Sequence, residues 1–244
     1  MEKANYKLQN TVESTHWWYL CRRNMLKSYI KNMGLNTASL IFDGGTSTGT
    51  NLRLLQEMGF KHYVGLDLSP EAIRLCAQKK LGSLTQGDLT KIPYCDNSFD
   101  FILATDVFEH IKNDQDALQE CFRILKPGSK AIFTVPTFQC IWGLQDEVSH
   151  HRRRYLKHTF ISAVENAGFN IEKSYYYNFI MFLPIWLARI IIRKFNLALN
   201  SEAEVNTVLI NELMKITFRF DIFLSKYIEP PVGVSAFILA SKPK

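Results

Sequence analysis

Short apolar runs alternate with helix-like stretches through the middle of the chain. We expect five strands, at residues 39–43, 62–67, 84–89, 99–105 and 131–136. Between them, residues 70–80 and 113–124 place apolar side chains at helical spacing. Strands that alternate with helices of this length predict an α/β fold with a parallel, doubly wound sheet, that is, a Rossmann-like core.

The carboxyl-terminal part adds two strands and a long helical insertion. We expect strands at 171–178 and 233–240, and the segment between them is far longer than a hairpin needs. Residues 179–188 are very apolar, Pro184 is expected to kink them, and 204–228 form a second helical stretch. The first stretch is too short for a standard membrane span. Two interpretations remain: a helical pair packed on the sheet, or a lid that accepts a lipid-like substrate.

The first 37 residues show helical patterning, with aromatic residues crowded at Trp17–Tyr19. They form either a helix packed on the sheet or a cap over a pocket, with His16 and Arg22 facing a substrate. We therefore predict one domain, 1–244. Its expected parts are an N-terminal helical cap at 1–37, a core at 38–178 and 231–244, and a helical lid insertion at 179–230.

A glycine-rich loop follows the first strand and leads into a helix. A phosphate-binding P-loop would need lysine after the last glycine, and Thr50 stands there. A dinucleotide loop would need the spacing G-x-G-x-x-G, which the loop lacks. The pattern D-x-G-x-G-x-G, which cradles S-adenosylmethionine, fits at Asp43, Gly45 and Gly49, with Ser47 in place of the middle glycine. An ordinary loop with a few glycines remains an alternative.

Two further aspartates end the next two strands. Asp67 stands roughly where an acidic residue meets ribose hydroxyls in such a unit, and a carboxylate accepts from both hydroxyls. Strand-end aspartates often merely cap the next helix, but Ser69 and Pro70 already supply that start signal. Asp88 is placed to accept from an adenine amino group.

These segments resemble the class I S-adenosylmethionine-dependent methyltransferases, in the broad UbiE/UbiG-like group. The resemblance rests on six segments in the right order: 43–49, 65–70, 87–89, 97–100, 106–111 and 125–128. It implies a mostly parallel seven-stranded sheet with an antiparallel last strand. It also implies S-adenosylmethionine as cofactor, with S-adenosylhomocysteine as product. The departure from the family pattern is Ser47, whose side chain could narrow the methionine end of the pocket.

The expected cofactor site follows from the loop, the strand ends and this resemblance. It consists of Asp43, Gly45, Thr46, Gly49, Asp67, Leu68, Asp88, Leu89, Thr105 and Val107. The chemistry is displacement at a sulfonium methyl group, in which the protein mainly aligns the nucleophile. A base is needed only where the nucleophile must lose a proton, and His110 is the expected catalytic residue.

A second group of polar residues lies beyond the fourth strand. Asp106, Glu109, His110 and His150 could together bind a divalent cation. The alternative is that they only shape the pocket and hold the loop, and we expect no metal. The basic run 150–155 is either a solvated turn or a clamp for a carboxylate or phosphate on the substrate.

Composition narrows the setting of the protein. The 244 residues are 47% hydrophobic and 21% charged, which suits one domain with a real core. Five scattered cysteines, without C-x-x-C, indicate reduced thiols, and the amino terminus lacks a signal peptide's apolar core. We therefore expect a cytoplasmic protein. A net charge of +6 permits an acidic substrate or a membrane surface, and it is too diffuse to argue for nucleic acid.

The expected function is methyl transfer to a small-molecule or lipid-linked acceptor, at oxygen, with peripheral membrane contact through 179–230. A nicotinamide-dependent reductase would share the sheet and Asp67, but the Tyr-x-x-x-Lys pair it predicts does not occur. A non-catalytic methyltransferase-like partner protein is the third possibility, and Ser47 is its only hint.

Overall fold

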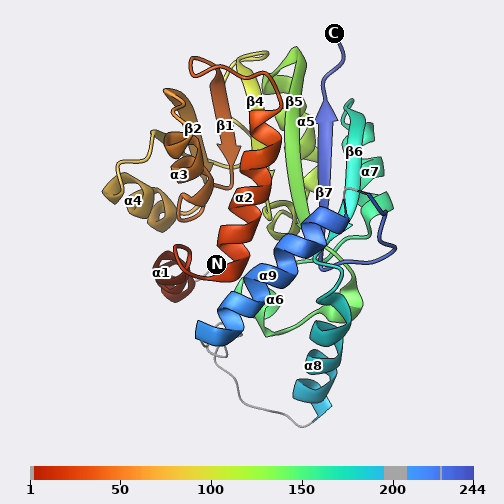
Figure 1. Cartoon of the computed structure of the whole chain (residues 1–244). Coiled ribbons are helices and arrows are strands. Elements are labelled where there is room, and N and C mark those ends of the chain that lie inside the picture. The colour runs from red at the N-terminus through yellow and green to blue at the C-terminus, as the bar shows by residue number, and fades with distance from the viewer. Residues whose placement is uncertain (1–2, 195–207, 226) are drawn as a thin grey trace.

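The computed structural model describes residues 3–194, 208–225 and 227–244 (Figure 1). Within them, one sheet has seven strands in the order β3-β2-β1-β4-β5-β7-β6. The strands are β1 (Leu40–Gly44), β2 (His62–Asp67), β3 (Ser83–Gln86), β4 (Phe99–Thr105), β5 (Leu125–Pro136), β6 (Asn170–Tyr177) and β7 (Ser235–Ser241).

The first five strands are parallel, and β7 runs antiparallel between β5 and β6. The predicted α/β sheet with an antiparallel last strand is therefore confirmed. Asp43 pairs with Gly65 on one side and with Leu103 on the other. This register brings the carboxyl ends of β1, β2 and β4 to one edge of the sheet, where open α/β folds place their ligands.

Helices cover both faces of the sheet. They are α1 (Lys3–Val12), α2 (Trp17–Lys31), α3 (Thr50–Glu57), α4 (Pro70–Gln78), α5 (Asp114–Ile124), α6 (Leu144–Val148), α7 (Lys157–Asn166), α8 (Phe182–Lys194) and α9 (Val208–Leu224). In Figure 1, α2 and α9 cross the near face, and α5 lies behind the sheet. None of the helices in the described ranges is long and apolar enough to cross a bilayer.

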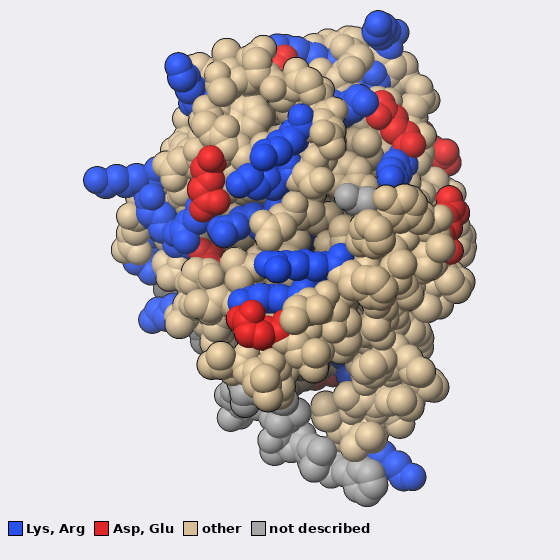
Figure 2. Space-filling model, in the orientation of Figure 1, with Lys and Arg blue, Asp and Glu red and all other residues tan. Residues whose placement is uncertain are grey.

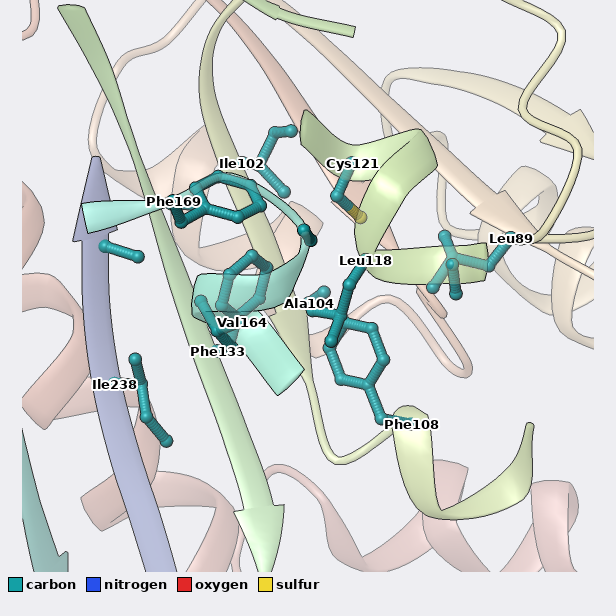
Figure 3. Close-up of a cluster of buried hydrophobic side chains, with 14 of the residues drawn as sticks. Leu89, Ile102, Ala104, Phe108, Leu118, Cys121, Phe133, Val164, Phe169 and Ile238 are labelled. Carbon is teal, nitrogen blue, oxygen red and sulfur yellow. The ribbon is translucent and has the colours of Figure 1, made fainter. Parts of the chain in front are cut away.

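The alternation of side chains along each strand builds a separate core on each face. Ile102 and Phe133 point to the side of α5 and α7, where they pack with Leu118 and Val164 (Figure 3). Phe101 and its neighbours on the opposite face pack against α2, α3 and α9. Because both faces are buried, the central strands read as nearly continuous apolar runs.

Two expectations about local structure are wrong. The fifth strand begins at Leu125 instead of residue 131, because Leu125 pairs with Phe99 before a bulge interrupts the ladder. Pro184 does not kink the apolar segment, because α8 begins at Phe182 and its first turn tolerates proline without a lost hydrogen bond. The second predicted helix, 204–228, is observed at 208–224, and residues 204–207 lie outside the described ranges.

A buried carboxylate fastens α9 to the end of β6. Asp221 accepts hydrogen bonds from the backbone nitrogens of Asn178 at 2.6 Å and Ile180 at 2.8 Å. Its side chain is fully buried. Asp221 therefore fixes the position of α9 relative to the sheet.

Replacing Asp221 with alanine should lower the free energy of unfolding by about 1–3 kcal/mol, because two buried backbone donors lose their acceptor. Urea denaturation measures the change. The matched control is Glu212→Ala on the exposed side of α9, which should stay within about 0.5 kcal/mol of the parent. Equal losses in the two variants would show that Asp221 has no special role.

Candidate active site

A large cavity opens at the carboxyl edge of the sheet. Its volume is about 1070 Å³, and its walls come from the ends of β1, β2 and β4 and from α1, α2, α8 and α9. That is at the upper end of the usual range for ligand pockets, about 300–1000 Å³. The cavity is therefore large enough to hold more than one small molecule.

Eight of the ten residues expected at a cofactor line this cavity. They are Gly45, Thr46, Asp67, Leu68, Asp88, Leu89, Thr105 and Val107. The other two, Asp43 and Gly49, lie behind the wall, where they shape the loop. The catalytic candidate His110 also lines the cavity. It follows β4, whereas Asp67 ends β2, and β1 lies between these two strands in the sheet.

The loop after β1 has the backbone conformation that its glycine pattern predicts. Gly45 has a φ of +74°, and a Cβ there would lie 2.3 Å from Cγ2 of Val107. Ser47 also has a positive φ, 50°, which explains why glycine is the usual residue at this position. The Ser47 hydroxyl donates to Gln9 of α1 at 3.2 Å. The side chain that replaces glycine is thus held by the N-terminal helix.

Asp67 joins this loop to the turn after β2. Its two oxygens accept from the backbone nitrogens of Ser47, at 2.8 Å, and Ser69, at 2.9 Å. Burial raises the pKa of Asp67, and these two hydrogen bonds oppose that rise. Each carboxylate oxygen has a second lone pair, so Asp67 can still accept from two hydroxyl groups in the cavity.

Asp43 acts through a neighbour. It is fully buried, and burial raises its pKa to about 6. One of its oxygens accepts from Nδ2 of Asn51 at 2.8 Å, and the same nitrogen donates to Oγ1 of Thr105 at 3.0 Å. Asn51 lines the cavity, so Asp43 orients a wall residue that the sequence had not singled out.

Helix α1 closes the cavity over the same loop. Glu13 is buried and accepts from the Lys79 ammonium at 2.6 Å, from the Thr50 hydroxyl at 3.1 Å and from the Thr48 hydroxyl. The Lys79 ammonium also donates to the Thr48 carbonyl at 2.6 Å. Nothing in the sequence pattern marks Glu13, because a single glutamate in the turn after α1 gives no periodic signal.

At the other end of the cavity, two imidazoles and two carboxylates lie together. Asp146 is buried, and its Oδ1 lies 2.8 Å from Nδ1 of His151. The rings of His110 and His151 meet edge to face, with centroids 4.7 Å apart. The Glu109 carboxylate is buried 3.8 Å from Nε2 of His151, and neither of its oxygens has a hydrogen-bond partner among the described side chains and backbone.

Burial determines which of these histidine and carboxylate side chains are charged. It lowers the pKa of His110 to about 3, and the neighbouring His151 contributes to the shift. His110 is therefore neutral at neutral pH. Burial, together with the charge of Asp106, raises the pKa of Glu109 well above its ordinary value. One atom from each of Glu109, His110 and His151 lies within 4.8 Å of the others, so these three residues could also hold a divalent cation.

The cation set considered from the sequence is wrong in two members. His150 is exposed with a φ of +56°, and His151 faces the cavity in its place. Asp106 is paired with the buried Arg22 of α2 and accepts from the Thr134 hydroxyl at 3.1 Å. Two adjacent histidines in a turn give no periodicity, so the sequence could not tell which one points inward.

The basic run 150–155 fits neither interpretation completely, because two of its arginines are ion-paired within the protein and a third stands at the cavity mouth. Arg153 is bound to Asp114 at 3.1 Å, and Nε of Arg154 lies 2.8 Å from Asp146. Arg152 is exposed at the cavity mouth, and its Nε donates to the His110 carbonyl at 3.0 Å. Together with the exposed Lys112, it supplies positive charge at the rim of the cavity.

Comparison with known proteins adds to this geometry. Residues 42–133 match the family model described as a methyltransferase domain. The chain is 29% identical over 113 residues to phosphoethanolamine N-methyltransferase 1 of Arabidopsis thaliana, covering 44% of this chain and 23% of the relative. It is 24% identical over 162 residues to a malonyl-[acyl-carrier protein] O-methyltransferase of a Marinomonas species, covering 62% and 60%. The chain thus spans less than two thirds of the length of these relatives.

The match to another relative covers more of both chains. The chain is 27% identical over 181 residues to demethylmenaquinone methyltransferase of Oceanobacillus iheyensis, covering 70% of this chain and 71% of the relative.

Solved structures share the fold. A structure of a Haloferax volcanii methyltransferase activator, Trm112, with a methyltransferase matches with a TM-score of 0.66 and 20% identity, covering 99% of this chain and 95% of that one. The [4+2]-cyclase SpnF matches with a TM-score of 0.60 and 19% identity, covering 89% and 80%. The fold and the loop geometry agree with the family model, and residues 42–133 form a methyltransferase domain with the fold of the class I S-adenosylmethionine-dependent methyltransferases.

Proposed function

We propose that this protein transfers a methyl group from S-adenosylmethionine to an oxygen atom of a small-molecule or lipid-linked acceptor. The observation that carries the proposal is the placement of Asp67 beside the loop 43–49 on the wall of one large cavity. S-adenosylhomocysteine would be the product. The whole chain would form a single domain, in which residues 1–37 are a cap and residues 179–230 are a lid.

The cofactor would lie along the carboxyl edge of β1, β2 and β3. Asp67 would accept from the ribose hydroxyls, and the loop 43–49 would hold the methionine end. Asp88 already accepts from the backbone nitrogen of Thr90 with Oδ1, at 2.8 Å, and Oδ2 is available for an adenine amino group. Leu68 and Leu89 would supply apolar surface for the purine ring.

His110 would act as the base for an acceptor hydroxyl. The sulfonium makes its methyl group reactive, so the protein needs to align the oxygen and remove one proton. His110 is neutral at working pH and lines the cavity. His151, held by Asp146, lies against it and could pass the proton onward.

The cavity favours an acceptor with an apolar body and an anionic end. Trp17, Met181 and Ile185 give its outer part an apolar wall, while Lys112 and Arg152 stand at the rim. Quinone and acyl-carrier-linked acceptors appear in the names of the relatives. None of the five cysteines forms a disulfide with another described residue, which favours a cytoplasmic setting. Residues 179–230 would contact a membrane.

Replacing Asp67 with asparagine should weaken the binding of S-adenosylmethionine by about tenfold or more, because an amide loses one of the two acceptors offered to the ribose. Isothermal titration measures the dissociation constant. Asp96→Asn, on an exposed loop, is the matched control and should leave binding unchanged. Binding of NADPH in place of S-adenosylmethionine would contradict the proposed cofactor and favour a reductase.

Replacing His110 with glutamine should lower kcat by about 10²- to 10⁴-fold, with cofactor affinity unchanged, because proton removal is lost while the cofactor wall is intact. The assay measures S-adenosylhomocysteine formed with a panel of quinol, phosphoethanolamine and malonyl-acyl-carrier acceptors. His158→Gln, on the exposed side of α7, is the control. An unchanged rate would remove His110 from the mechanism.

The pH dependence of kcat/KM offers a separate check on His110. A base whose pKa lies at about 3 in the free enzyme stays neutral as the pH falls from about 8 to 6, so the parent should keep its rate over that range. A histidine of ordinary pKa would instead lose half its activity near pH ~6.5. Half-loss near that value would show that the base has the pKa of an ordinary histidine, against the lowered pKa of His110.

A further inference from the structure

One side of α9 carries a row of apolar side chains that nothing in the described structure covers. Leu209, Leu213, Ile216, Phe220 and Phe223 follow one another at spacings of four and three residues and are each between 54% and 80% exposed. This spacing puts all five on one stripe of the helix. We call this row the α9 stripe.

The α9 stripe is not the face by which the helix packs on the protein. The opposite face carries the buried Phe218 and Asp221, and Asn211, which accepts from the backbone nitrogen of Trp17 at 2.8 Å. Helix α8 has the same organisation: Leu183, Leu187 and Ile191 are exposed on one side. Both helices therefore present an exposed apolar side that does not pack on the described part of the protein.

The inner faces of the same helices form part of the cavity wall. Met181 and Ile185 of the α8 region, and Ile210 and Met214 of α9, all line the cavity. The exposed apolar surface is thus continuous with the apolar entrance of the candidate site. An occupant of this surface would lie next to the acceptor's path.

The charged residues around the exposed apolar surface indicate what kind of partner would cover it. Helices α2 and α8 contain no acidic residue. The outer parts of α2 carry Lys27 and Lys31, and α9 adds Lys215 and Arg219. Among the described residues of α9, the only exposed acid is Glu212. Figure 2 shows the lysine and arginine side chains gathered in a band across the face where α2 and α9 cross, with a few acidic side chains among them.

We propose that this face docks on an anionic lipid bilayer. The α9 stripe and the exposed residues of α8 would enter the interface between headgroups and acyl chains, and the lysines and arginines would meet the anionic headgroups. A second copy of the chain is a poorer occupant, since pairing through this face would bring one positive band against another. The inference deepens the proposed function, because a lipid-linked acceptor could then pass from the bilayer into the cavity.

The experiment is flotation of the full chain with vesicles. Vesicles of equimolar phosphatidylcholine and phosphatidylglycerol should retain the protein at least about tenfold better than pure phosphatidylcholine vesicles, and added salt should reduce the difference. The variant L213S/I216S/F220S should lose most of this binding. L156S, which removes an exposed leucine at the start of α7, is the matched control and should bind as the parent does.

Three results would overturn the proposal: no binding to the mixed vesicles, equal binding by the triple variant, or a dimer in sedimentation velocity that the triple variant dissociates. Thermal melting and titration with S-adenosylmethionine check that the triple variant is folded. These titrations also separate this inference from the proposed function. If the chain floats with the vesicles but does not bind S-adenosylmethionine, membrane docking stands and the proposed reaction is contradicted. If it binds S-adenosylmethionine but does not float, the proposed reaction stands and membrane docking is contradicted.

Discussion

The structure depends on how the carboxyl edge of the sheet satisfies its polar groups. Here the Asp67 carboxylate accepts one backbone N–H from the loop after β1 and one from the turn after β2. The backbone nitrogens of Gly45 and Thr46 also donate to the Leu66 carbonyl of β2, at 2.8 and 3.0 Å. The cavity wall, the helix start at Thr50 and the placement of Asn51 all follow from the same loop. Backbone and side-chain hydrogen bonds to the end of β2 thus fix the loop together.

The end of the cavity at His110 is organised differently, around a buried charge. Burial alone would raise the pKa of Asp146, but hydrogen bonds from His151 and the guanidinium of Arg154 lower it to about 2. Arg189 of α8 approaches the same carboxylate at 3.5 Å. The anion therefore ties the turn after α6 to the insertion, and it fixes one histidine ring. A buried charge is stable there only because several donors surround it.

The sequence predicts the features that repeat and misses those that do not. Short apolar runs revealed the strands and the period of 3.6 residues revealed most helices, and the strand-end positions of Asp67 and Thr105 placed them at the right edge. The choice between His150 and His151 depended on one turn with a positive φ, which no pattern records. Glu13, Asn51 and Asp146 act through tertiary contacts with residues far along the chain. Such partners become visible only when the fold brings them together.

The two ends of the cavity are bounded by segments that lie far apart in the sequence. At one end, α1 is clamped to the loop through Glu13, Lys79 and Gln9. At the other, α8 and α9 form the wall. The two ends of one cavity are therefore held by separate sets of contacts, and a substitution in α1 would disturb one end without touching the helices that form the other.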